Sequence, residues 1–269
     1  TTLKFGSGTS TTNNTSRSFG TDRDVNFSGS GELDNGTTFS VSTTTNDDLG
    51  LSASTTTITT PSLGSFSLGA SNGSVSYLYD EEVPQAYEQV SDAKQTISNQ
   101  VGDYMDNNHI AYTSPTFEVF GASVTGHLGY SPQPLDDTTS TGDGGQATYT
   151  PGIGKGTEAG ITIAYEGLKV GVYGTEMERK VPYSVGSSGN YEHDEFNGVW
   201  YAKYSMGPVS IGYSESYMDA GRSGTTITTN TKKTERTHAG IFTGEQMSIA
   251  FNVNDNMSIS YTTSDETYD

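Results

Sequence analysis

An acidic stretch in the first half of the chain holds the residues best suited to chemistry. Asp80, Glu81 and Glu82 are consecutive, and Glu88 and Asp92 follow shortly after. Closely spaced carboxylates could serve as the acid and base of a hydrolase, or form a negative ring that attracts cations in a channel. No second carboxylate motif fixes the geometry of an active site, so the sequence gives the hydrolase interpretation little support.

Other candidate ligands are scattered through polar stretches. Asp47–Asp48, Asp136–Asp137 and Glu192–His193–Asp194 offer oxygen atoms that could hold a loop-bound calcium ion, although charged loop residues are more often simply solvated. No other cofactor is expected. Four histidines lack the spacing of a metal site and are interpreted as wall or loop residues: His109, His127, His193 and His238.

Composition excludes several classes of protein. The 269 residues carry a formal net charge of −19, which argues against binding to nucleic acid or to anionic lipid surfaces. There are no cysteines, so disulfides and thiolate metal sites are absent. No run of 18 apolar residues predicts a membrane-spanning helix. No signal peptide is seen, although a mature chain would have lost one.

Around the acidic stretch, the chain has the pattern of short amphipathic strands. Apolar residues alternate with Ser, Thr, Gly and Asn, for example over residues 120–130 and 160–173. Tight turns alternate with long polar loops. In an up-and-down meander, the short turns therefore lie at one end of the sheet and the long loops at the other. The tight turns are expected at 34–36, 61–64, 114–115, 166–167, 206–207 and 254–256.

The apolar face of these strands ends in aromatic residues, and the opposite face is small and polar rather than charged. A soluble all-β protein would bury the apolar face and expose charge. Strands that are apolar outside and polar inside, with aromatic girdles, are typical of an outer-membrane β-barrel, which must close because lipid offers no hydrogen-bond partners. The predicted girdle consists of Tyr112, Tyr130, Tyr165, Trp200, Tyr204, Tyr213 and Tyr261.

The segment 74–108 interrupts the strand pattern and contains the acidic stretch. A solvated external loop is the simplest interpretation of such a charged insertion. However, Val83, Tyr87, Ile97 and Val101 give it more packing groups than a solvated loop needs. We therefore expect it to fold inward as a constriction loop.

Two short motifs resemble the alphaproteobacterial general porins, which are trimeric diffusion channels of the Gram-negative outer membrane. Residues 31–36, Gly-Glu-Leu-Asp-Asn-Gly, are similar to their first periplasmic hairpin. Residues 80–88, with Pro84 and Tyr87, resemble the start of their third external loop, which lies in the lumen between strands five and six. The resemblance implies a single barrel domain over residues 1–269 and a homotrimer.

The porin barrel has sixteen strands, whereas about thirteen are counted here, and an odd number does not close a bacterial single-chain barrel. We expect about three C-terminal strands to be absent from this sequence. Strands two to four are rich in Thr and Ser, which the resemblance explains because that side of the barrel contacts the other subunits.

The expected function is passive diffusion of small hydrophilic solutes across the outer membrane, without catalysis. The resemblance implies that the acidic loop faces a basic wall. Strand parity assigns Lys4, Lys169 and Lys203 to that wall, while Arg17, Arg23, Arg179 and Lys180 lie near loops. With so few basic residues, we expect cations to be preferred. The expected partners are outer-membrane lipid, lipopolysaccharide and identical subunits.

Two alternatives remain open at this point. A substrate-specific channel would need a ladder of aromatic residues along the lumen, where the predicted face is mostly small. A β-rich surface protein without a pore would show no conductance.

Overall fold

The computed structural model describes residues 3–9, 15–21, 24–46, 49–70, 74–80, 82–85, 105, 108–132, 153–179, 183–184, 190–219, 221, 241–255 and 257–268. Most of them form one thirteen-stranded antiparallel sheet in which neighbours in the sequence are neighbours in space. The strands are β3 (Val25–Glu32), β4 (Thr38–Thr45), β5 (Leu51–Thr60), β6 (Gly64–Ala70), β7 (His109–Thr113), β8 (Phe117–Val119), β9 (Ala122–Ser131), β10 (Ile153–Tyr165), β11 (Leu168–Arg179), β14 (Glu195–Met206), β15 (Val209–Asp219), β16 (Ile241–Asn254) and β17 (Met257–Tyr268).

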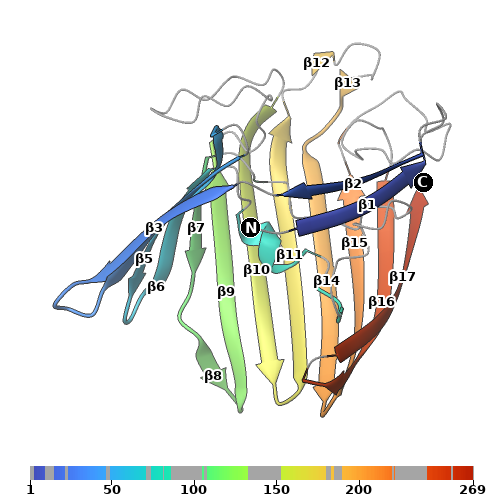
Figure 1. The fold of residues 1–269 in the computed structure, drawn as a ribbon. Helices are drawn as coiled ribbons and strands as arrows, with labels where there is room; N and C mark the ends of the chain where they lie inside the picture. The colour runs from blue at the N-terminus through green and yellow to red at the C-terminus, as the bar shows by residue number, and fades with distance from the viewer. Residues whose placement is uncertain are drawn as a thin grey trace.

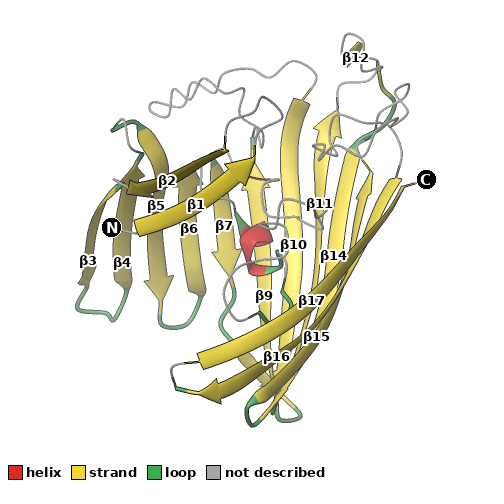
Figure 2. Cartoon of the chain, turned by 45° about the vertical axis from the view of Figure 1, so that its right-hand side comes forward, coloured by secondary structure: helices red, strands yellow, loops and turns green. Residues whose placement is uncertain are grey.

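The sheet curls into the wall of a barrel (Figure 1). A 3-10 helix, η1 (Val75–Leu78), lies inside the curve in both views (Figures 1 and 2). Among the described residues, the edge strands β3 and β17 do not pair with each other, so this part of the chain forms an open wall. The predicted all-β meander is thus confirmed.

Two short hairpins lie outside this sheet. β1 (Leu3–Thr9) pairs with β2 (Thr15–Thr21), and β12 (Tyr183–Ser184) pairs with β13 (Asn190–Tyr191). The alternation of apolar residues in the sequence did not predict β2, whose residues are mainly Thr, Ser and Gly. No helix in the described ranges has the length and apolar character needed to cross a membrane.

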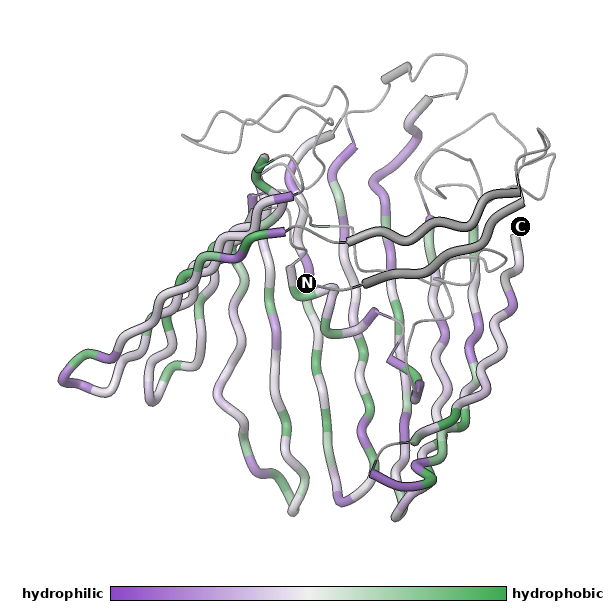
Figure 3. The backbone as a smooth tube through the Cα atoms, viewed as in Figure 1, coloured by the Kyte–Doolittle hydropathy of each residue, from purple (hydrophilic) through white to green (hydrophobic). Residues whose placement is uncertain are grey.

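Side chains alternate between the two faces, as β10 shows. Ile161, Ile163 and Tyr165 are exposed on the outer face, whereas Glu158 and Gly160 face η1. Figure 3 shows the resulting alternation of hydrophobic and hydrophilic residues along the wall. The exposed apolar face is the one that contacts lipid in a membrane barrel.

The inner face is less uniformly small than the sequence suggested. Tyr173, Tyr201 and Phe242 are buried there and form one cluster with Val75 and Tyr79 from the segment that follows β6. The expectation of a lumen face made mostly of small residues is therefore wrong for β11 and β14, whereas β16 has Gly244, Ser248 and Ala250 at inward positions. Large inner residues are tolerated because a loop, and not only water, lies against them.

Two glycines in the tight turns have positive φ angles for which glycine is well suited. Gly64 has φ +80°, and a Cβ at this position would collide with the backbone carbonyl of Thr113. Gly207 has φ +59° but has open space around it. The first turn is therefore constrained by both conformation and packing, and the second by conformation alone.

We predict that Gly64→Ala destabilises the folded protein more than Gly207→Ala does. The Gly207 change should cost about 1 kcal/mol of backbone strain, whereas the Gly64 change adds a steric clash and should cost roughly 3 kcal/mol. Urea unfolding followed by the gel mobility of unheated samples measures both. Equal costs for the two variants would contradict the packing role of Gly64.

Candidate functional site

The candidate site is the place where the segment after β6 crosses the inner face of the wall. Its first contact is with Glu158 of β10. The backbone N–H of Val75 donates to Glu158 Oε1 at 2.9 Å, and the hydroxyl of Tyr173 donates to Glu158 Oε2 at 2.6 Å. Both oxygens of this buried carboxylate are thus used to fix the start of the segment to the wall.

Tyr79 anchors the segment one turn later. Its ring is fully buried and stacks on Tyr173 with centroids 5.2 Å apart. Its hydroxyl lies 2.7 Å from Nδ1 of His127. Burial, reinforced by the neighbouring Tyr201 and by the carboxylate of Glu158, raises the pKa of the Tyr79 phenol.

Gly160 makes room for this anchor. A Cβ at Gly160 would overlap the ring of Tyr79. The same relation recurs further along, where a Cβ at Gly212 would overlap the ring of Pro84. These wall glycines allow the segment to approach the backbone closely.

Glu82 joins the segment to two basic residues of the wall. Its carboxylate forms an ion pair with Lys203 and lies 3.8 Å from Nζ of Lys169. The register of β11 and β14 places these two lysines directly opposite each other, an arrangement that is unfavourable for like charges. Glu82 offsets that repulsion, and all three side chains keep partial contact with water.

The ring of Tyr201 contacts both of these lysines. The Nζ atoms of Lys169 and Lys203 lie 5.7 and 5.6 Å from the centroid of its ring, which is within the range of cation–π attraction. Tyr201 itself is fully buried. It therefore supports the lysines rather than offering a surface to a solute.

The segment then reaches the far side of the wall. The hydroxyl of Ser248 on β16 donates to the carbonyl oxygen of Pro84, and Thr262 on β17 donates to Ser248 at 3.0 Å. Near its return, the carbonyl oxygen of Asn108 accepts a hydrogen bond from Ser131 at 2.7 Å. Residues 74–85 thus run across the interior from β9 and β10 to β16.

The predicted acidic and basic residues are distributed as follows. Asp80 is partly buried beside η1, and Glu82 contacts the wall as described. Lys169 and Lys203 come together with Glu82. Glu81, Glu88, Asp92 and the side chain of Lys4 lie outside the described residues.

Sequence reasoning missed the residues that anchor the start of the loop. Tyr79, Glu158 and Tyr173 form the anchor, yet attention to the carboxylates of the loop passed over them. One signal was available for Glu158, because the other inward residues of β10 are Gly, Thr and Ala.

The aromatic residues of the predicted girdle share the outer face, although two of them lie away from the strand ends. Trp200 and Tyr213 lie midway along β14 and β15, and both donate hydrogen bonds to Glu215. The others on this face are Tyr112, Tyr130, Tyr165, Tyr204 and Tyr261.

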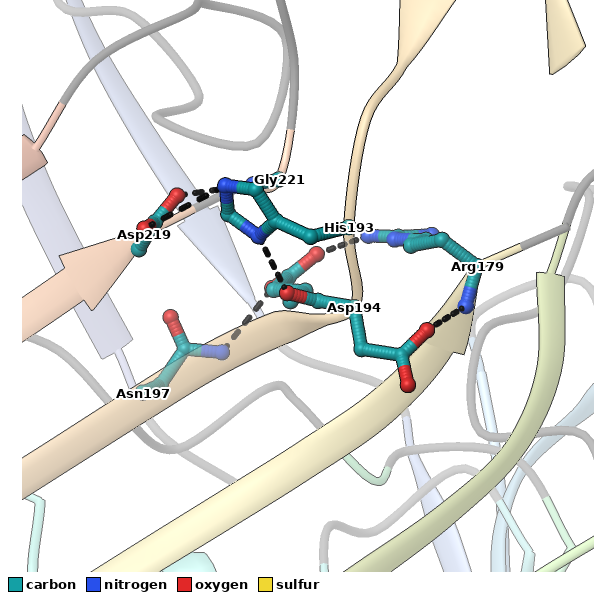
Figure 4. A network of polar contacts seen from close by, with 7 residues as sticks. Arg179, His193, Asp194, Asn197, Asp219 and Gly221 are labelled. Carbon is teal, nitrogen blue, oxygen red and sulfur yellow. Dashed lines mark hydrogen bonds and ion pairs between the residues drawn. The ribbon is translucent and has the colours of Figure 1, made fainter. Parts of the chain in front are cut away.

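A second polar network ties the upper ends of β11, β14 and β15 together (Figure 4). Arg179, which was expected near a loop, lies at the end of β11, where it is buried and forms an ion pair with Glu195. Its guanidinium carbon lies 4.6 Å from the centroid of the Tyr191 ring, a cation–π contact. Asp194 accepts a hydrogen bond from the backbone of Arg179 at 2.7 Å. This network holds the bases of two long external connections.

The calcium candidates receive no support from the described part of the chain. Asp194 is engaged by Arg179, and His193 lies 3.7 Å from Asp219. The described residues contain no group of three His, Asp or Glu side chains suited to a metal ion. Asp47–Asp48 and Asp136–Asp137 lie outside them.

Comparisons with known proteins agree with this architecture. A solved porin structure shares the fold with a TM-score of 0.58 and 14% identity, over 95% of this chain and 78% of that chain. OmpT, an outer membrane protein of Vibrio cholerae, is more distant, with a TM-score of 0.46 and 10% identity over 99% of this chain and 84% of its own. No curated protein matches.

The family comparison covers most of the sequence. Residues 2–240 match the model of the Gram-negative porins. Taken with the lipid-compatible outer face and the segment crossing the interior, this match shows that the chain belongs to the Gram-negative porin family, whose members are channels of the outer membrane.

Proposed function

We propose that this porin is a general diffusion channel that passes small hydrophilic solutes, prefers cations, works as a homotrimer and performs no catalysis. The main observation behind the proposal is that residues 74–85 are attached to the inner wall at three points. These points are Glu158, Lys203 and Ser248. A segment held at three points across a water-filled interior narrows it to an eyelet. Segment 74–108 is accordingly proposed as the constriction loop.

The character of the inner aromatic residues favours general diffusion over a substrate-specific channel. Tyr79, Tyr173 and Tyr201 are at most 3% exposed, so their faces are unavailable to a passing sugar or amine. A row of aromatic residues that guides a substrate would instead expose its ring faces to the lumen. The hydrolase alternative is weakened in the same way, because Glu82 is engaged by two lysines.

Charge supports the proposed cation preference. The chain has 32 acidic and 13 basic residues, and the two described lysines of the eyelet share Glu82 as a counter-charge. Rings of carboxylates favour cations. On the outer face of β4 and β5, Thr43, Ser54 and Thr56 interrupt the apolar residues Phe39, Val41 and Ile58. This mixed surface favours contact with another subunit over contact with lipid.

The reversal potential of the channel in a planar bilayer under a salt gradient tests the whole proposal. We expect the sign of a cation-preferring pore and closure in three steps at high voltage. Anion preference would overturn the selectivity, and absence of conductance would overturn the channel.

We predict that Glu82→Gln and Lys203→Gln change selectivity in opposite directions. Removing Glu82 leaves two lysines without their carboxylate, so the cation-to-anion permeability ratio should fall by roughly a factor of two, and removing Lys203 should raise it by a similar factor. Glu176→Gln on the outer face is the matched control and should leave the ratio unchanged. Shifts of the same sign for both eyelet variants would contradict the proposed arrangement.

We also predict that Gly160→Ala loosens the loop. The new Cβ would displace Tyr79 from its seat, so the open-channel current should become noisier and thermal stability should fall. Gly29→Ala on β3 provides the comparison, because a Cβ there meets nothing within 4 Å. A quiet Gly160→Ala channel with unchanged stability would show that Tyr79 does not anchor the loop.

A further inference from the structure

The inner face of the sheet is covered unevenly. The helix η1 lies against β9 and β10 in both views, and the segment that follows it reaches Lys203 on β14 and Ser248 on β16 (Figures 1 and 2). On this part of the wall, many inward side chains are at most 2% exposed, among them Thr175, Asn197, Ser214 and Gln246.

The inward residues of β4, β5 and β6 keep contact with solvent. Strand register carries the inner face from Glu158 through Gly129 and Ala111 to Ser67 on β6 and Thr57 on β5. Neither of these last two residues is buried. The same holds for the other inward Ser and Thr residues of 40–44, 55–59 and 65–67, and we call this surface the hydroxyl wall.

The covered part of the wall ends at β7. Ala111 on β7 packs against the buried cluster that contains Val75 and Tyr79. Neighbouring strands are about 4.8 Å apart, so Ser67 lies one strand beyond this contact and Thr57 lies two strands beyond it. These two residues are therefore the first inward side chains past the anchor of the loop in this direction.

The hydroxyl wall carries no charge. The strands β4, β5 and β6 contain no Asp, Glu, Lys or Arg. The hydroxyls of Thr57 and Ser67 lie 2.9 Å apart, and those of Thr59 and Ser65 lie 2.8 Å apart. Because a hydroxyl both donates and accepts, each pair keeps a proton and lone pairs for water or a solute without introducing a charge.

The lysines described in the eyelet lie on the part of the wall to which the segment is attached. Lys169 on β11 and Lys203 on β14 both interact with Glu82 of the segment. The resemblance to the general porins implies an acidic loop that faces a basic wall. In this chain, these two basic residues instead contact the acidic segment directly, and the side chains left facing solvent on β4 to β6 are neutral.

We propose that ions and solutes pass between the loop and the hydroxyl wall, and that the residues at positions 57 and 67 set how strongly the pore discriminates by charge. Since β4, β5 and β6 supply no counter-charge, a charge introduced there acts directly on a passing ion. This inference rests on the proposed channel function and adds to it the part of the wall that determines selectivity.

The absence of cysteine from the sequence allows a direct test. Single Ser67→Cys and Thr57→Cys channels are recorded in a planar bilayer under a salt gradient, before and after addition of a methanethiosulfonate reagent. We expect the anionic ethylsulfonate reagent to raise the cation-to-anion permeability ratio about twofold at either position, and the cationic ethylammonium reagent to lower it by a similar factor. Each channel serves as its own reference, because conductance before the reagent shows that the variant is folded.

Two cysteine variants serve as controls. Thr56→Cys lies next to Thr57 on the outer face of β5, and Ser214→Cys lies on the covered inner face of β15. Both should leave the permeability ratio unchanged. Cysteines at 57 and 67 that do not react, adducts there that leave the ratio unchanged, or a larger effect from Ser214→Cys would each contradict the proposed path. A wild-type protein without conductance would instead contradict the channel function itself.

Discussion

The register of the wall is the constraint on which the other features depend. In lipid, every backbone N–H and C=O must find its partner on a neighbouring strand, and side chains then alternate strictly between the faces. A slip of one residue in β10 would bring Glu158 to the lipid side and Ile161 and Ile163 to the water side. The loop anchor would be lost in the same step, because Val75 and Tyr173 both bind Glu158. Membrane compatibility and the inner site are therefore fixed by one choice of register.

The strands and their faces were predictable because a period of two is a local property of the sequence. The alternation over residues 160–173 predicts β10, β11 and the turn between them, and the parity that places Lys169 and Lys203 on one face follows from it. The path of the loop was not predictable in the same way, because the contact between Glu82 and Lys203 joins residues far apart in the sequence. β2 was missed because its alternating positions hold Ser, Gly and Arg, with Phe19 as the one large apolar residue. Small polar residues of this kind are typical of loops as well as of barrel walls.

Glycine in the wall has a more specific role than curvature. Glycine in a barrel wall allows curvature and leaves lumen space, yet the space over Gly160 and Gly212 is filled by Tyr79 and Pro84. Gly171 makes similar room within the wall, for the ring of Tyr201 on the neighbouring strand. The wall and the loop are complementary in size, so a large residue on one side faces a missing side chain on the other. This complementarity explains how an inner face with bulky aromatic residues still admits a loop.

Two roles of the charged residues in the eyelet need to be distinguished, attachment of the loop to the wall and the proposed selection of ions. Lys169, Lys203 and Glu82 together carry one positive charge, so these three residues do not by themselves favour cations. Screening in water limits the influence of distant charges to about 8 Å, so the net charge of −19 does not by itself decide the sign in the pore. The proposed cation preference therefore depends on further acidic residues of the loop, among them Glu81, Glu88 and Asp92. Glu82 has a different task, because its position between two opposed lysines makes it the group that fixes the loop to the wall. Glu82 thus offsets the positive charge of the two lysines, and the proposed surplus of negative charge comes from the other carboxylates of the loop.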